Sequence, residues 1–115
     1  MRYVVGFFPP DRIFALVDAL SEIHVHGMTV SDAQGFGQEH DAAHPEHREH
    51  MGIEMTKKTR IEIICRDEEV DLILNAIYTA AHSGRRGDGK VFVLPVLDAL
   101  RLKTGERGEA ALGLG

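Results

Sequence analysis

The chain has little cysteine, no tryptophan and no long apolar run, and these shortages exclude several classes of protein. Of its 115 residues, one is cysteine and none is tryptophan. The single Cys65 cannot form an internal disulfide, so we expect a reducing compartment and a buried thiol. The apolar stretch at residues 3–8 is broken by Pro9 and is too short for a signal peptide or a membrane span. These features predict a cytoplasmic protein.

Basic residues are also in the minority. The chain has 13 Lys and Arg against 18 Asp and Glu, which gives a net charge of −5 with neutral His. Proteins that bind DNA or RNA usually carry an excess of Lys and Arg to meet the phosphate backbone. We therefore do not expect a nucleic acid as the main partner. The length predicts one domain that spans residues 1–115.

Signatures of catalysis are missing as well. The sequence has no Ser/His/Asp or Cys/His arrangement around a nucleophile, and Cys65 lies in an apolar segment typical of inert core. Glu62 has no evident catalytic partner. The sequence therefore predicts a protein that is not an enzyme.

What is present predicts an α+β fold. Two segments have apolar residues at helix spacing, and four have the apolar, β-branched composition of strands. Pro95 in the last strand places that strand at a sheet edge or bends it. The order is the ferredoxin-like βαββαβ arrangement, with both helices on one face of the sheet and self-association through the other. The expected strands are residues 3–8, 28–36, 59–65 and 91–97, and the expected helices are residues 11–23 and 67–82.

Two segments are predicted to lie outside the core. Residues 38–54 contain too few apolar side chains to be buried, so we expect an exposed loop after the second strand, of a length usual for functional or disordered loops. Residues 104–115 end in Ala and Gly and are predicted to form a flexible tail. The loop holds histidines interleaved with carboxylates, which could ligate zinc or another transition metal, or could order on a partner instead. These weak metal candidates are His40, His44, His47 and His50.

A glycine-rich turn at residues 84–90 is the first candidate binding element. Gly87 and Gly89 let backbone N–H groups approach a ligand closely, and such groups in succession bind anions. Lys90 adds a positive charge, while Asp88 could hold the shape of the turn or contact a hydroxyl. The turn is interpreted either as a phosphate site or as an ordinary solvated turn. Further cations that could contribute are Arg85, Arg86, Arg101 and Lys103.

Phe36 lies between two glycines at the end of the second predicted strand. Gly35 and Gly37 indicate either a close approach of the backbone to a ligand or a strand end with a bulge. The residues alone favour neither interpretation.

Several segments together resemble the PII signal-transduction proteins over nearly the whole chain. They are residues 27–30, 35–37, 58 with 60–63, 79–80 with 84, 87–93, and 101–106 with 110–111. The resemblance implies a homotrimer with adenine-nucleotide sites between subunits, and a long loop that docks onto a transporter or another regulated protein. It assigns phosphate contacts to Gly87, Asp88, Gly89, Lys90, Arg101 and Lys103. It assigns the adenosine pocket to Thr29, Gly35, Phe36, Gly37 and Ile64, with Gln38 beside it, and a 2-oxoglutarate contact to Lys58.

The sequence departs from the PII pattern at two places. Gln38 and Glu39 stand where the family usually has Arg and Gln, which removes a phosphate partner and changes the residue that helps to bind magnesium. Met51 replaces the modified tyrosine. These departures resemble a divergent PII-like branch, such as carboxysome-associated proteins that sense AMP or ADP with bicarbonate and control a membrane transporter. The alternatives are a nitrogen regulator that binds ATP and 2-oxoglutarate, and a metal-responsive module linked to heavy-metal efflux.

Overall fold

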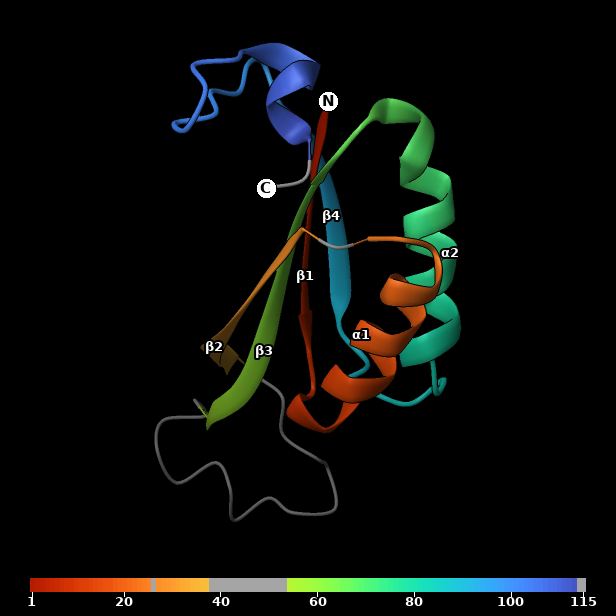
Figure 1. Cartoon of the computed structure of the whole chain (residues 1–115). Coiled ribbons are helices and arrows are strands. Elements are labelled where there is room, and N and C mark those ends of the chain that lie inside the picture. Colours follow the sequence, from red (N-terminus) through yellow and green to blue (C-terminus); the bar gives the residue numbers. More distant parts are fainter. Residues whose placement is uncertain (26, 38–53, 114–115) are drawn as a thin grey trace.

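The fold is a four-stranded antiparallel sheet with two helices packed on one face (Figure 1). The computed structural model describes residues 1–25, 27–37 and 54–113, with the side chains at 37 and 54 excepted. The sheet has the strand order β2-β3-β1-β4. This is the expected ferredoxin-like α+β arrangement, with β4 at an edge as Pro95 indicated. The elements are β1 (Arg2–Phe8), α1 (Ile13–Glu22), β2 (Met28–Gly37), β3 (Glu54–Cys65), α2 (Val70–Ala81) and β4 (Lys90–Pro95).

The core lies between the sheet and the two helices. Alternate residues of β1 and β3 face the helices, because successive side chains of a strand point to opposite faces. Cys65 belongs to this layer, as predicted, and burial raises the pKa of its thiol. The most deeply buried side chains are Val4, Phe8, Leu16, Leu20, Ile61 and Ile73.

The other face of the sheet has no helix over it in the described part of the chain. Phe92, Leu94 and Ile64 lie on it and are 49%, 44% and 42% exposed. On the same face the hydroxyl of Tyr3 donates a hydrogen bond to Glu62, and this bond raises the pKa of the tyrosine. This face therefore exposes apolar side chains around the hydrogen-bonded pair of Tyr3 and Glu62.

Two strands, β3 and β4, differ most from the sequence predictions. β3 begins at Glu54 rather than at residue 59, because residues 54–58 pair with the end of β2 although their side chains are mostly polar. The expected loop therefore loses its last residue to the strand, and the rest of it lies outside the described residues. β4 begins at Lys90, which pairs with Phe7, and it ends at Pro95 rather than at residue 97.

The C-terminal segment contains more regular structure than the predicted loose tail. Leu100 and Arg107 form an antiparallel bridge, and residues Gly108–Leu112 form the 3-10 helix η4. The carboxylate of Asp98 accepts hydrogen bonds from Arg107, which lower the pKa of the aspartate. Polar hydrogen bonds rather than apolar burial fix this segment, so hydrophobic patterning did not reveal it. No helix among the described residues is long and apolar enough to cross a membrane.

Candidate functional site

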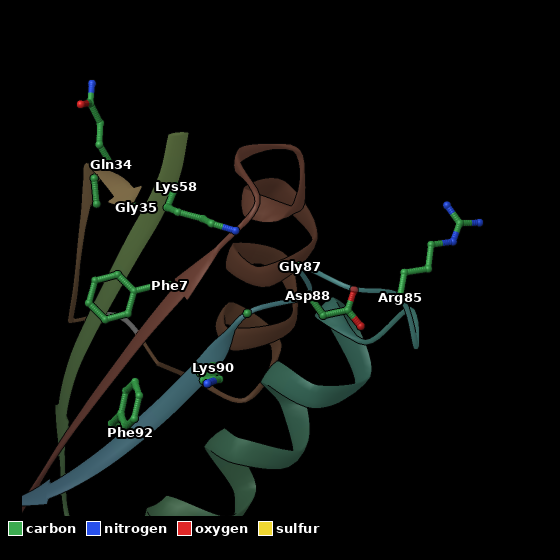
Figure 2. Close-up of a pocket in the computed structure, with 11 residues that line it drawn as sticks. Phe7, Gln34, Gly35, Lys58, Arg85, Gly87, Asp88, Lys90 and Phe92 are labelled. Carbon is green, nitrogen blue, oxygen red and sulfur yellow. The ribbon is translucent and has the colours of Figure 1, made fainter. Parts of the chain in front are cut away.

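A cleft of about 560 Å³ opens on the exposed face of the sheet, at the end where β4 begins. Its walls come from β1, from β4, from the β2–β3 pair and from the glycine-rich turn that joins α2 to β4 (Figure 2). The cleft brings together seven of the residues that the sequence singled out. These are Gly35, Lys58, Arg85, Gly87, Asp88, Gly89 and Lys90.

The two glycines of the turn have different structural roles. Both adopt a positive φ, 93° at Gly87 and 109° at Gly89, which disfavours any residue with a Cβ. A Cβ at Gly89 would lie 2.1 Å from the carbonyl oxygen of Phe7, whereas a Cβ at Gly87 would meet nothing within 4 Å. Gly89 therefore packs the turn against β1, and Gly87 leaves space in front of it.

Asp88 holds the shape of the turn. Its carboxylate accepts hydrogen bonds from the backbone amides of Ser83, at 2.7 Å, and Gly84, at 2.9 Å, and another from the Ser83 hydroxyl. These bonds, led by the one from the Ser83 hydroxyl, lower the pKa of Asp88 to about 2. Of the two roles considered for Asp88, the structure shows the one that shapes the turn.

The cleft combines cationic and aromatic side chains. Lys58 reaches it from β3 and Lys90 from β4, while the rings of Phe7 and Phe92 line it (Figure 2). The side chain of Arg85 extends outward from it. Two cations beside flat apolar rings suit a ligand with an aromatic body and an anionic group.

The sequence analysis missed both phenylalanines as site residues. Strand alternation could have identified them. Phe7 pairs with Lys90 in the sheet, and Phe92 follows Lys90 by two residues and so lies on the same face. The sequence analysis interpreted Phe7 and Phe92 only as parts of apolar strands.

Other expected site residues do not reach this cleft within one chain. Ile64 is six residues from Lys58 along β3, which separates them by about 20 Å. Thr29 pairs with Glu62 near the same far end. Phe36 lies on the opposite face of β2 from Gly35, because the two are consecutive in the strand.

Arg101 and Lys103 also lie away from the cleft. They belong to the segment that follows β4, at the other end of the sheet from the glycine-rich turn (Figure 1). The Arg101 amide donates to the carbonyl of Glu106 at 2.9 Å, and the Arg101 guanidinium lies 3.7 Å from the Glu106 carboxylate. The two halves of the expected site are thus held apart in a single chain.

The remaining candidates are Gly37, Gln38 and the histidines of residues 38–54. Gln38 and the four loop histidines, His40, His44, His47 and His50, lie outside the described residues. Gly37 ends β2, opposite Glu54. In the described ranges, no three His, Cys, Asp or Glu side chains gather in a way that could hold a metal ion.

Comparison with known proteins identifies the relatives of this chain. The family model described as nitrogen regulatory protein P-II matches residues 1–106. The chain belongs to the P-II family. It is 34% identical over 112 residues to the nitrogen regulatory protein P-II of Azospirillum brasilense, a match that covers 97% of this chain and all of that protein. It is 40% identical over 107 residues to a P-II homolog of Arabidopsis thaliana, which covers 89% of this chain and 53% of the longer plant protein.

The solved structures agree with this assignment. The crystal structure of Arabidopsis thaliana PII bound to citrate superposes with a TM-score of 0.79 at 35% identity, over 99% of this chain and 91% of that one. P-II proteins are regulatory signal transducers, so the chain is a regulatory protein and not an enzyme. The resemblance seen in the sequence is therefore confirmed at the level of the family, while the comparisons do not single out a carboxysome-associated branch.

Proposed function

We propose that this P-II protein is a cytoplasmic sensor of adenine nucleotides, which binds AMP or ADP, with ATP as the alternative. The observation that carries the proposal is the cleft in which the open Gly87 backbone lies beside Lys58, Lys90 and the two aromatic rings. Phosphate groups suit the turn and the lysines, because successive N–H groups and ammonium groups bind anions. The rings offer a surface against which a base can stack.

A complete site on this proposal needs more than one copy of the chain. Arg101, Lys103, Ile64 and Thr29 lie at the far end of the sheet from the glycine-rich turn. A head-to-tail ring places the far end of one copy against the turn of the next, and such a ring closes with few subunits. The exposed apolar side chains on the uncovered face support this assembly. We therefore propose a homotrimer with nucleotide sites between its subunits.

The second ligand proposed for the sensor is bicarbonate. Lys58 supplies a cation beside the nucleotide cleft, and Gln38 and Glu39 replace the Arg and Gln usual in the family. An added carboxylate at residue 39 opposes a large dianion such as 2-oxoglutarate through like-charge repulsion. The proposed output is control of a membrane transporter in inorganic-carbon metabolism through residues 38–54, because a ligand that favours one state of a protein changes the affinity of that protein for a partner.

A nitrogen regulator that binds ATP and 2-oxoglutarate is the second candidate. It is favoured by the relatives, which are named as nitrogen regulatory proteins in bacteria, an archaeon and a plant. The citrate in the Arabidopsis structure is a carboxylate ligand of a related protein, so a carboxylate beside Lys58 also fits this candidate.

Isothermal titration calorimetry separates the two candidates. The protein is titrated with AMP, ADP and ATP, each with and without bicarbonate, and with ATP, magnesium and 2-oxoglutarate together. AMP or ADP binding that bicarbonate strengthens supports the carbon sensor, and ATP binding that requires 2-oxoglutarate supports the nitrogen regulator.

Lys90→Ala should weaken nucleotide binding by at least about tenfold, since it removes a charge-assisted contact. Lys57→Ala is the matched control, because Lys57 does not line the cleft. Equal affinity of the two variants would exclude the assigned site.

A further inference from the structure

A second cavity lies behind the glycine-rich turn, on the helix side of the sheet, and the proposed nucleotide site does not use it. It measures about 440 Å³ and lies between the second half of α2, the end of β1 and the start of β4. Concave, mostly apolar cavities with a few polar groups are the usual form of small-molecule sites. The apolar walls come from Phe8, Leu74, Ile77, Ala81 and Val91.

Two stacked rings form one wall of this cavity. Tyr78 and His82 have ring centroids 4.6 Å apart and ring planes inclined by 18°. Tyr78 is 64% exposed. The pair offers a flat surface that is already in place for another ring.

The polar side of the cavity carries a negative charge. Asp88 lines it with a side chain that is 25% exposed, and a carboxylate oxygen of Asp88 lies 3.8 Å from Nδ1 of His82, which also lines the cavity. No Lys or Arg is among the described residues that line the cavity, and Asp88 is the one acidic residue there. The cavity therefore favours a cation over an anion, and aromatic faces add to that preference.

We propose that this cavity binds a small aromatic molecule with one cationic group, with its ring against Tyr78 and its charge toward Asp88. Asp88 and Gly89 line both this cavity and the nucleotide cleft, so a molecule bound here contacts the turn that the nucleotide contacts from the other side. A shared element of this kind couples the affinities of two sites. The coupling rests on the proposed nucleotide function, whereas binding to the cavity does not.

Benzamidine is a suitable probe, with benzoate as its charge-reversed counterpart. Titration of the full chain, followed by amide NMR shifts, should show saturable changes at Ala81, Gly89 and Val91, and benzoate should bind at least about fivefold more weakly. Tyr78→Ala should weaken benzamidine binding by at least about fivefold through loss of the stacking surface. Leu72→Ala is the matched control, because Leu72 is 55% exposed on the same helix and does not line the cavity. Equal binding by the two variants, or benzoate binding as tightly as benzamidine, would overturn the site.

The coupling has its own measurement. ADP is titrated with and without saturating benzamidine, and its dissociation constant should change by at least about threefold. An unchanged ADP affinity with benzamidine bound would overturn the coupling. A protein that binds benzamidine through Tyr78 but binds no nucleotide would uphold the cavity site and contradict the proposed function instead.

Discussion

The carboxylate of Asp88 accepts hydrogen bonds from both the backbone amide and the hydroxyl of Ser83, five residues earlier in the chain. This contact closes the turn between α2 and β4 and fixes where Gly87 and Lys90 lie relative to the sheet. The shape of the candidate site therefore depends on an acidic residue that is itself engaged within the protein.

The Asp88 contacts predict a specific acid dependence of stability. The pKa of Asp88 is lowered to about 2 in the folded protein, whereas an ordinary Asp in an unfolded chain titrates near 4. Its contribution to stability is thus complete above about pH 4 and is lost as the pH falls toward 2. In urea unfolding, the stability difference between the wild type and Asp88→Asn should shrink over this range. Asp18→Asn, on an exposed helix position, is the control, and a difference that stays constant down to about pH 2.5 would contradict the assignment.

The two glycines of the turn should respond differently to the same substitution. Gly89→Ala combines a strained φ with a clash against the Phe7 carbonyl oxygen, so we expect a loss of about 2–4 kcal/mol in the free energy of unfolding. Gly87→Ala carries only the backbone strain, for which we expect about 1–2 kcal/mol. Chemical denaturation of both variants checks this, and equal losses would show that the close approach at Gly89 is not as described.

Alanine substitutions on α2 should destabilise the protein in proportion to how deeply the replaced side chain is buried. Ile73 is 1% exposed and Leu72 is 55% exposed, although they are adjacent. Ile73→Ala should cost about 2–5 kcal/mol through lost burial and a residual cavity, and Leu72→Ala less than about 0.5 kcal/mol. Similar unfolding midpoints for the two variants would mean that the helix is rotated from the orientation found here.

Substitutions of the two neighbouring lysines of β3 should distinguish a specific contact with the anionic co-ligand from a general effect of positive charge. Lys58 lines the cleft and Lys57 does not, because consecutive strand residues face opposite sides. Lys58→Ala should reduce the response of nucleotide binding to bicarbonate or 2-oxoglutarate by about tenfold, while Lys57→Ala leaves it nearly intact. The measurement is calorimetric titration of the nucleotide at fixed co-ligand concentration. Equal responses would place the co-ligand elsewhere.

Much of the fold followed from patterns in the sequence. Ile61 and Ile63 are spaced by two residues on one face of the segment, and this period of two correctly predicted a strand with one buried face. Residues 54–58 of the same strand were missed, because their order comes from backbone pairing with β2 rather than from apolar burial. The C-terminal bridge between Leu100 and Arg107 was missed for a similar reason, since hydrogen bonds to Asp98 support it.

The candidate site was only partly predictable. Gly87, Gly89 and Lys90 are adjacent in sequence, so their grouping in one turn needed no tertiary information. The contribution of Phe7 depends on the pairing of β1 with β4, which a linear pattern does not specify. The separation of Arg101 from the turn depends on the path of the chain after β4, which likewise emerges only in three dimensions.

A subunit-complementation experiment tests the central proposal, that nucleotide binds between copies of the chain. Lys90→Ala and Arg101→Ala remove cations from the two separated halves of the site, so each homomeric variant should bind nucleotide weakly. After the two are unfolded together and refolded as a mixture, random assembly puts an intact Lys90 and an intact Arg101 in about one quarter of the interfaces. Calorimetry should then find wild-type affinity at about one quarter of the sites. A mixture that binds no better than either variant alone would contradict a site shared between subunits.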